Sequence, residues 1–486
     1  MTVRTRYAPS PTGYLHIGGA RTALFSYLFA KKNGGQFILR IEDTDTERNI
    51  EGADLEQMNG LEWLGVVADE STEKGGPHEP YRCMQRLDLY TEYADRLVAE
   101  GKAYYSYANQ AELEQEREEQ LARGEAPKFS GWDRHLSEEQ IAAYQAEGRV
   151  PSIRLAVPQD QALAFSDYVR GDVEFDSNGI GDFIIVRPDG RPTYNFAVVI
   201  DDALMNITHV IRGEEHISNT PRQLCVAQAL GFGVPKFAHI PLILNHEGKK
   251  MSKRDESIVQ FISQYRDLGY LPEAIVNFLA LLGWSPEGEE EIFTLEELTE
   301  LFSLERVSKS PATFDTAKLK WMNNYYIKKS SLERITDLAI PYLEKAGKIS
   351  SSLAPEQKEW VTRLVGLYQE QMDEISQIVE LSDIFFRQDI NYSPEAEQIL
   401  AEDSVPTVIS SYMAEVQAQE GLDVATVKSM FKAVQKETGF KGKQLFMPVR
   451  AVISGETHGP DLTETILLLG KDTVVKRLQS FVDKRS

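Results

Sequence analysis

The N-terminal stretch holds the first residues whose types and spacing could do chemistry. A short β-rich run from Arg4 is broken by prolines, and a helical pattern resumes near Ala20, with His16, Gly18 and Gly19 at the junction. A strand, a tight turn and a helix start present backbone N–H groups and the positive end of the helix dipole, which suits an anion. This stretch alone predicts a phosphate site, with a purely structural turn as the alternative.

A second segment far along the chain, Lys250-Met-Ser-Lys-Arg254, favours the phosphate interpretation. Its three cations could stabilise phosphate charge from another side. A charged surface loop is the alternative.

Composition and charge limit the classes of protein. The 486 residues are 42% hydrophobic and 26% charged, as in soluble proteins of several domains, and no apolar run of about 18 residues could span a membrane. Arg4, Arg6 and His16 interrupt the N-terminus, so we expect no signal peptide and a cytoplasmic protein. Two cysteines exclude a disulfide framework and a cysteine-rich zinc site. Because the net charge is −23, an RNA-binding surface must rest on local basic patches.

Around these residues the sequence predicts a parallel sheet interrupted by an inserted α+β subdomain. Residues 36–42 are typical of a buried parallel strand, whose acidic end lies where open α/β sheets bind ligands. Charged helices, a capping box at Ser137 and Gln140, and a run of short strands predict the insertion. Further strands are predicted at 194–200, ending in Asp201-Asp202, at 207–211 and at 237–244, and further helices at 54–65, 86–100, 111–124 and 219–231.

From about residue 257 onward the sequence predicts almost only helices, with capping boxes at Thr294/Glu297 and Ser330/Glu333. Two basic clusters occur in this part. The first contains Lys318, Lys320, Lys328 and Lys329 beside Trp321, Tyr325 and Tyr326. The second contains Lys428, Lys432 and Lys436 at i,i+4 spacing, followed by Lys441, Lys443 and Arg450. Cations among aromatics are typical of nucleic-acid surfaces, and a solvated helix face is the alternative for each cluster.

Together these segments resemble the class I aminoacyl-tRNA synthetases and, over essentially the whole chain, the bacterial glutamyl-tRNA synthetase family. His16-Ile-Gly-Gly19 and the Lys250–Arg254 segment are similar to the two signatures of that class. The supporting segments are Arg40-Ile-Glu-Asp-Thr-Asp45, Pro192-Thr-Tyr-Asn-Phe-Ala197, Asp201-Asp-Ala-Leu-Met205 and Ile211-Arg-Gly-Glu-Glu-His216.

The resemblance implies a Rossmann-type parallel-sheet catalytic domain with an inserted α+β subdomain, followed by all-α C-terminal domains. The implied parts are the two catalytic halves at 1–94 and 194–255, an acceptor-end-binding insertion at 95–193, a stem-contact domain at 256–328, and an anticodon-binding domain at 329–378 and 379–486.

The family's reaction is ATP-dependent activation of L-glutamate and its transfer to the 3′ end of tRNA-Glu, with tRNA required for activation. Such catalysis stabilises charge and aligns reactants. The implied catalytic residues are His16 and Lys253. The implied ATP-binding residues, acting with Mg²⁺, are His16, Gly18, Gly19, Lys250, Met251, Ser252, Lys253 and Arg254.

The resemblance also implies a glutamate pocket. A site that chooses glutamate over glutamine needs a cation in a partly dry pocket. Arg6 and Arg212 would hold carboxylates and Glu42 would receive the ammonium group, with a surface ion pair as the alternative for each arginine. The full implied set is Arg6, Ala8, Ser10, Glu42, Tyr194 and Arg212, and the implied tRNA contacts are Lys318, Lys320, Lys428, Lys432 and Lys443.

The chain departs from the family pattern in three places. Gly19 replaces the second histidine of the first signature, and Arg254 replaces the last serine of the second. Some relatives bind zinc through Cys-x-Cys and Cys-x-His, where this chain has Ser106-x-Ala108 and Asp133-x-His135, so we expect no zinc.

Specificity and competing functions complete the expectations. Relatives strict for tRNA-Glu use an arginine to read the third anticodon base, and residues 364–371 contain none, so we expect tolerance of both tRNA-Glu and tRNA-Gln. A monomer is expected. A catalytically silent tRNA-binding paralogue is the alternative function, against which the presence of His16, Lys253, Arg6 and Arg212 argues. A nicotinamide oxidoreductase is disfavoured because the chain lacks Gly-x-Gly-x-x-Gly after a strand.

Overall fold

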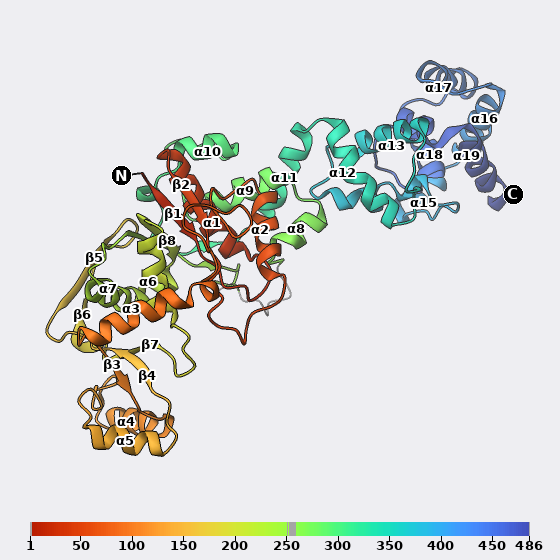
Figure 1. Cartoon of the computed structure of the whole chain (residues 1–486). Coiled ribbons are helices and arrows are strands. Elements are labelled where there is room, and N and C mark those ends of the chain that lie inside the picture. Colours follow the sequence, from red (N-terminus) through yellow and green to blue (C-terminus); the bar gives the residue numbers. More distant parts are fainter. Residues whose placement is uncertain (1, 250, 252–258, 486) are drawn as a thin grey trace. The chain divides into compact units, whose positions relative to one another are not determined.

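The computed structural model describes residues 2–249, 251 and 259–485, and its internal contacts divide the chain into two compact units (Figure 1). Unit 1 comprises Met1–Arg266 and Pro272–Leu319, and unit 2 comprises Asp267–Leu271 and Lys320–Ser486. Each unit has its own buried hydrophobic clusters. Among the described residues, no helix is long and apolar enough to cross a membrane.

Unit 1 combines strands and helices. Its strands are β1 (Arg4–Tyr7), β2 (Gln36–Leu39), β3 (Ala103–Ser106), β4 (Ser152–Leu155), β5 (Ala162–Asp167), β6 (Gly171–Asp176), β7 (Phe183–Val186), β8 (His209–Gly213), β9 (Lys236–Ile240), β10 (Ile243–Leu244) and β11 (Ala312–Thr313). Its helices are α1 (Ile17–Lys32), α2 (Ala53–Trp63), α3 (Leu87–Ala99), α4 (Gln110–Ala122), α5 (Glu138–Ala146), α6 (Tyr194–Leu204), α7 (Thr220–Leu230), α9 (Pro272–Leu281) and α10 (Leu295–Leu301). Two further helices, α8 (Ile262–Leu268) and α11 (Thr316–Lys329), run from one unit into the other.

The parallel strands of unit 1 end at one edge. β1 pairs in parallel with β2, and β8 pairs in parallel with β9. The N–H of Thr208, just before β8, donates to the carbonyl of Arg4 at the start of β1 (2.9 Å), so these strands lie side by side (Figure 1). The loops after Tyr7, Leu39 and Gly213 therefore meet at the carboxyl edge, where open α/β sheets bind ligands. This arrangement confirms the predicted Rossmann-type parallel sheet.

Residues 194–200 form a helix, so the strand predicted there is wrong. α6 begins at Tyr194 and buries one apolar face. A run this short and apolar fits a buried strand or a buried helix, and its periodicity alone does not separate them. The helix brings the side chains of both Asp201 and Asp202 to arginines of the sheet region, whereas a strand would point them to opposite faces.

The predicted insertion contains parts of two different sheets. β3, β4 and β7 form an antiparallel sheet, and α4 and α5 lie together beyond it, α5 with the predicted capping box at Ser137 (Figure 1). β5 and β6 form a hairpin, but β5 also pairs in parallel with β9 through Asp167 and Phe237. The hairpin therefore extends the parallel sheet. The bounds of the six predicted segments stay predictions.

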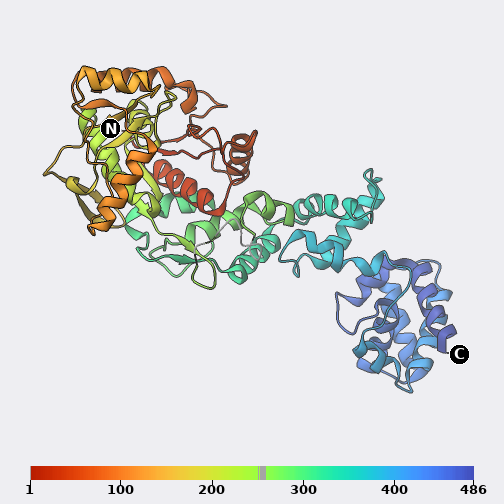
Figure 2. The same cartoon turned by 90° about the horizontal axis from the view of Figure 1, so that it is seen from below.

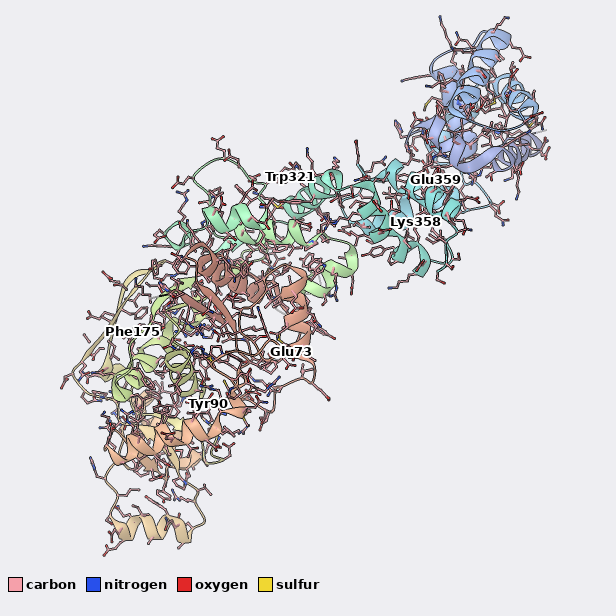
Figure 3. The ribbon with its side chains drawn as sticks, turned by 45° about the horizontal axis from the view of Figure 1, so that its top comes forward. Glu73, Tyr90, Phe175, Trp321, Lys358 and Glu359 are labelled. Carbon is pink, nitrogen blue, oxygen red and sulfur yellow. The ribbon has the colours of Figure 1, made fainter. Side chains whose placement is uncertain are left out.

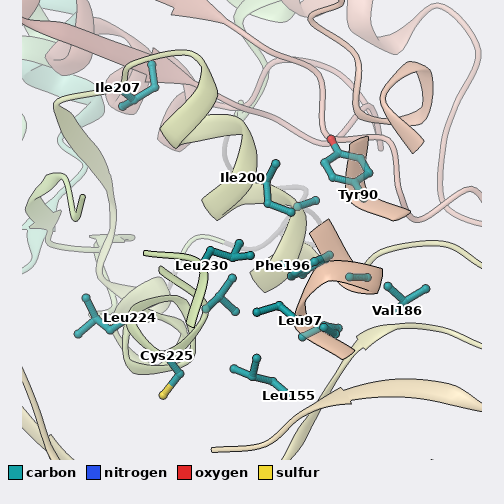
Figure 4. Close-up of a cluster of buried hydrophobic side chains, with 14 of the residues drawn as sticks. Tyr90, Leu97, Leu155, Val186, Phe196, Ile200, Ile207, Leu224, Cys225 and Leu230 are labelled. Atoms are coloured by element: carbon teal, nitrogen blue, oxygen red, sulfur yellow. The ribbon is translucent and has the colours of Figure 1, made fainter. Parts of the chain in front are cut away.

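A hydrophobic cluster holds α3, α6 and α7 against the strands of unit 1 (Figure 4). Leu97 of α3, Phe196 of α6 and Leu230 of α7 are at most 2% exposed. Burying one such side chain contributes about 1.5–3 kcal/mol. The cluster therefore fixes α6 and, with it, the polar side chains that α6 presents to the site.

The described part of unit 2 is helical, which confirms the expectation of all-α C-terminal domains. Its helices are α12 (Leu332–Lys345), α13 (Pro355–Tyr368), α14 (Ile378–Leu381), α15 (Pro394–Leu400), α16 (Val405–Ala418), α17 (Val424–Thr438), α18 (Lys443–Ser454) and α19 (Leu462–Arg485). Figure 2 shows α15–α19, in blue, grouped around one shared core.

One predicted helix start in unit 2 is displaced by a residue. The capping box at Thr294/Glu297 in unit 1 is confirmed, but the one at Ser330/Glu333 is wrong. The N-cap of α12 is Ser331, whose hydroxyl accepts from the N–H of Arg334 (3.3 Å). Ser330 instead ends α11, because its N–H donates to the carbonyl of Tyr326 (3.0 Å). Two adjacent serines make the choice ambiguous in the sequence.

Candidate active site

A cavity of about 480 Å³ lies at the carboxyl edge of the parallel strands. The six residues predicted to hold glutamate all line it: Arg6, Ala8, Ser10, Glu42, Tyr194 and Arg212. β1 supplies Arg6, the segment after β2 supplies Glu42, α6 supplies Tyr194 and β8 supplies Arg212. The fold thus brings together residues from four elements that are distant in the sequence.

A second cavity of about 360 Å³ adjoins the first and contains the other described motif residues. His16, Gly18, Gly19 and Met251 line it. The two cavities share Gly18, Gly19, Thr22, Gly213 and Glu215. The remaining predicted ATP-binding residues, Lys250, Ser252, Lys253 and Arg254, lie outside the described residues.

His16 is the N-cap of α1. Its Nδ1 accepts the N–H of Gly18 (3.0 Å), and its Nε2 lies 3.1 Å from Oε1 of Gln260. Because Nδ1 is an acceptor, the ring proton of the neutral imidazole is on Nε2. One backbone donor expected to be free for an anion, the N–H of Gly18, is therefore engaged by the cap.

Gly19 is a glycine because Tyr7 occupies the space of a side chain there. A Cβ on Gly19 would collide with the hydroxyl of Tyr7 and lie 3.4 Å from its Cζ. Tyr7 also lines the first cavity, and burial raises the pKa of its hydroxyl. The departure from the signature thus has a packing cause.

A buried network of charges holds Arg6. Arg6 Nε lies 3.2 Å and Arg40 Nη1 2.9 Å from Oδ1 of Asp202, and Arg40 Nη2 donates to Glu42 Oε1 (3.0 Å). All four side chains are buried. Burial opposes ionisation of Asp202, but the two guanidiniums lower its pKa below its usual value. Asp202 is therefore a charged, fixed partner that orients Arg6 at the cavity. Burial raises the pKa of Glu42 above its usual value even though Arg40 donates to it.

Asp201 connects the same network to residues that do not line the cavity. It accepts from Arg86 Nε (2.7 Å) and from the hydroxyl of Tyr90 (2.7 Å), and it lies 3.7 Å from Arg40 Nε. The thiol of Cys83 donates to it (3.4 Å), and burial raises the pKa of this thiol well above its usual value. Cys83 is thus a buried, protonated thiol.

Arg212 is held by three side chains. Its Nε lies 3.1 Å from Nε2 of His239, its Nη2 lies 2.8 Å from Oγ1 of Thr220, and its Nη1 lies 3.4 Å from the hydroxyl of Tyr194. Burial lowers the pKa of Arg212, and Tyr194 and Asp202 oppose this shift. The guanidinium is thus buried but still borders the cavity.

Sequence reasoning missed residues that act through contacts. Tyr7, Asp202 and His239 do not belong to the predicted set. Asp202 carried a signal, since two adjacent carboxylates follow an apolar run. The other missed residues of the first cavity include Thr44, Asp45, Arg48, Arg187, His216 and Asn219.

The predicted tRNA-contacting lysines lie at the surface. Lys318 pairs with Glu291, and Lys320 pairs with Glu374 (3.1 Å), near Trp321, which is 48% exposed (Figure 3). Lys428 and Lys432 are exposed on α17, and Lys443 is exposed at the start of α18. Phe446, 43% exposed, packs on Phe431 of α17. Contact of these lysines with tRNA stays a prediction.

Unit 2 contains a cavity of about 940 Å³. Tyr368 and Gln371, which belong to the segment 364–371, line it, and so do the cations Lys348, Arg387 and Arg450. Arg387 donates to the carbonyl of Ser454 (2.6 Å), and Arg450 donates to that of Pro460 (2.9 Å). The segment 364–371 thus borders a cavity whose cations come from other elements.

At the positions where some relatives bind zinc, a carboxylate forms hydrogen bonds. Asp133 Oδ2 accepts from Ser106 Oγ (2.7 Å), Tyr107 N (3.0 Å) and Ala108 N (3.2 Å). His135 is exposed. In the part of the chain that the structure describes, no group of three His, Cys, Asp or Glu residues could hold a metal ion.

Two models of known protein families match most of the chain. The family model of class I tRNA synthetases (E and Q), catalytic domain, matches residues 2–321, and the model of an anticodon binding domain matches residues 334–482.

Individual relatives match the whole chain. A glutamate–tRNA ligase of Halalkalibacterium halodurans is 57% identical over 99% of both chains, and that of Bacillus subtilis is 55% identical over 98% of this chain and 99% of its own. The crystal structure of a glutamate tRNA ligase from Elizabethkingia meningosepticum, in complex with its amino acid, superposes with a TM-score of 0.91 at 34% identity over 100% of both chains. The chain therefore belongs to the glutamate–tRNA ligase family of class I aminoacyl-tRNA synthetases.

Proposed function

We propose that this protein activates L-glutamate with ATP and transfers it to the 3′ end of tRNA, and that the 480 Å³ cavity is the glutamate site. One observation carries this assignment. Two buried arginines, Arg6 and Arg212, and one buried carboxylate, Glu42, line the same cavity. L-Glutamate has two carboxylates and one ammonium group, so the pocket presents the complementary set of charges.

The charge of the surrounding network supports the same substrate. The guanidinium of Arg212 donates to the uncharged side chains of His239, Thr220 and Tyr194, and no ion pair to it occurs among the described residues, so it adds an excess positive charge at the cavity. Burial and the nearby Arg212 lower the pKa of His216 to about 4, so this side chain adds no charge at neutral pH. Glutamate carries one net negative charge, and its binding would neutralise the excess. Glutamine, with no net charge, would leave it buried and unpaired, which is costly.

The wall that the two cavities share supports the proposed placement of glutamate and ATP side by side. Bound ATP in the second cavity would place its α-phosphate beside the first, where the glutamate carboxylate attacks and pyrophosphate leaves. His16 lines the second cavity, where its Nε2–H faces Oε1 of Gln260 (3.1 Å) and would exchange this partner for a phosphate oxygen, and Lys253 with its neighbours would stabilise the leaving pyrophosphate. We propose that Mg²⁺ enters on the ATP phosphates, since the described residues offer no cluster of three ligands for it.

Glutamate-dependent ATP–pyrophosphate exchange tests the assignment. We expect exchange with tRNA and none without it. Arg212→Ala should raise the KM for glutamate by roughly 100-fold, the ~3 kcal/mol expected for losing one partner of a buried charged contact. Arg222→Ala is the control, because among the described residues Arg222 donates only to the carbonyl of Ser218, in an exposed hydrogen bond (3.2 Å).

Three outcomes would count against the proposal. An unchanged KM in Arg212→Ala, with the variant shown to be folded by its melting curve, would refute the assigned pocket. Exchange without tRNA would refute the tRNA requirement but leave the ligase in place. No exchange in either condition would indicate the silent paralogue, an alternative that no comparison supports.

We further propose that tRNA-Gln is tolerated beside tRNA-Glu. The absence of arginine from residues 364–371 supports this, together with the engagement of Arg387 and Arg450 by backbone carbonyls. Charging of purified tRNA-Gln with glutamate measures it directly. A rate on tRNA-Gln at background level would refute tolerance.

We propose that the protein contains no structural zinc. We also propose that it acts as a cytoplasmic monomer. The hydrogen bonds of Asp133 to Ser106, Tyr107 and Ala108 tie together the segments that zinc would join. Elemental analysis of purified protein should find far less than one zinc per chain. Stoichiometric zinc would contradict this expectation.

A further inference from the structure

We propose that His239, oriented by Asp167, is a positioning residue that holds the guanidinium of Arg212 ready for a substrate carboxylate. This inference rests on the proposed function and adds two residues to it. Neither residue lines the cavity or belongs to a predicted motif.

The sheet sets the geometry of the hydrogen-bonded side chains Asp167, His239 and Arg212, which we call the relay. β8 and β9 are parallel neighbours, and Arg212 and His239 are paired in their register. Asp167 ends β5, on the other side of β9. His239 Nδ1 lies 2.6 Å from Asp167 Oδ2, and His239 Nε2 lies 3.1 Å from Arg212 Nε. The three side chains form one line across three strands, and none is more than 5% exposed.

The backbone fixes the carboxylate end of the line. Asp167 accepts the N–H groups of Val169 (2.9 Å), Arg170 (2.8 Å) and His239 (3.0 Å). These bonds hold the carboxylate as an acceptor, so the ring proton of His239 must be on Nδ1. Nε2 then carries a lone pair, which is what the Nε–H of Arg212 requires. Asp167 thus selects the tautomer of His239 that can bind Arg212.

The relay leaves Arg212 with oriented donors. A guanidinium has five N–H bonds, and three of them donate to His239, Thr220 and Tyr194. The other two, on Nη1 and Nη2, remain for a ligand in the cavity that Arg212 lines. A guanidinium held in this way does not have to be ordered when the substrate binds, so the contact is preorganised.

A purely structural role is the competing explanation. The ring of His239 packs on Phe165 and Phe237 at centroid distances of 5.9 and 5.8 Å, as a buried core histidine would. The two explanations differ in which ring nitrogen matters. Core packing needs the volume of the ring, whereas positioning needs an acceptor at Nε2.

Two substitutions of His239 separate these explanations. In His239→Asn the amide N–H can replace Nδ1–H, but no acceptor reaches Arg212. In His239→Gln the amide carbonyl can replace the lone pair of Nε2. We expect Asn to raise the KM for glutamate about tenfold and leave the KM for ATP unchanged, and Gln to restore the KM for glutamate to within about threefold of wild type. Equal KM values in the two variants would overturn the proposal.

The pH dependence of the wild type gives a second readout that does not need the Asn variant to fold. Groups facing His239 are Asp167 and Arg170 from the turn after β5, Arg212 from β8 and His216 before α7. Burial lowers the pKa of His239 below 6.5, and Asp167 opposes this shift. A protonated ring cannot accept from Arg212, so the KM for glutamate should rise as the pH falls through this pKa. The part of this rise that is due to His239 should be absent in His239→Gln, and identical pH profiles of this KM in the wild type and in His239→Gln would overturn the proposal.

Arg212→Ala distinguishes this inference from the proposed function. If Arg212→Ala leaves the KM for glutamate unchanged, the assigned pocket is wrong, and the relay has no function to support. If Arg212→Ala raises the KM while both His239 variants match the wild type, only the relay is refuted.

Discussion

Several residues of the site are determined by a neighbour that is distant in the sequence. Gly19 shows this most simply, because the hydroxyl of Tyr7 fills the space in which its side chain would lie. Asp202 shows it for charge, since it forms an ion pair with Arg6 and orients it at the cavity. In both pairs, one residue can be changed safely only if its partner changes too.

Gly19→Ala should destabilise the protein by about 1–3 kcal/mol, the usual cost of overpacking. Tyr7→Phe removes the colliding oxygen, and the nearest ring atom then lies 3.4 Å from the new methyl group. The double variant Tyr7→Phe/Gly19→Ala should therefore recover most of the loss. Chemical denaturation of the three variants measures this, and strictly additive effects would contradict the assigned collision.

The sequence indicated residues that line the cavity, but it did not indicate all the residues that hold them in place. Arg6, Glu42 and Arg212 belong to short contiguous motifs that can be read directly from the sequence, and all three line the cavity. Asp202 and His239 act through bonds to residues on other elements. A single sequence contains no record of such contacts. The adjacent carboxylates of Asp201 and Asp202 were a local signal for Asp202, but no local pattern indicated His239.

Among the elements, α6 has the largest effect on the site. It carries Tyr194 at its first turn and Asp201 and Asp202 at its third, and its apolar face packs in the core of unit 1 (Figure 4). The sequence predicted a strand here because the short, mostly apolar run 194–200 fits both structures. Predictions with two independent signals were correct, for example α7, which has Pro221 in its first turn and Gly231 after its end.

The start of α12 gives a test at the scale of one helix. Ser331→Ala removes the hydroxyl that accepts from Arg334 N, and should cost about 1 kcal/mol. Ser330→Ala is the matched comparison, because Ser330 ends α11 and does not cap α12. Denaturant unfolding of unit 2 measures both changes. A larger loss in Ser330→Ala would restore the predicted capping box and contradict the observed one.

At the scale of the whole molecule, the stability of unit 1 is expected to depend on pH. Unit 1 buries the carboxylate of Glu70 beside Arg4, the first residue of β1. Glu70, 2% exposed, accepts from Arg4 (2.7 Å), from the hydroxyl of Tyr81 (2.5 Å) and from His78 (3.1 Å). Burial would raise the pKa of Glu70, but these three donors lower it from 4.5 to about 2.

A lowered pKa in the folded state means that the unfolded chain binds the proton first as the pH falls. Glu70 therefore contributes stability above pH 4.5, and this contribution is lost between about pH 4.5 and pH 2. Glu70→Gln should be less stable at pH 7 and should lose less stability over that interval. Glu73→Gln, an exposed position on the same loop (Figure 3), is the control. Unfolding curves at several pH values test this, and parallel pH profiles for wild type and Glu70→Gln would contradict it.

The pairing of β5 with β9 has a consequence for any attempt to reduce this enzyme to a minimal fragment. The segment 95–193 is predicted to be an insertion in the parallel sheet, so it is an obvious segment to delete in a minimal design. Yet Asp167, which lies inside that segment, is bonded to His239 on the sheet. A chain without this segment would keep Arg6, Glu42 and Arg212. It would lose Asp167, which orients His239 and, through it, Arg212. Loss of glutamate recognition in such a truncation would therefore not show that tRNA contacts had been removed.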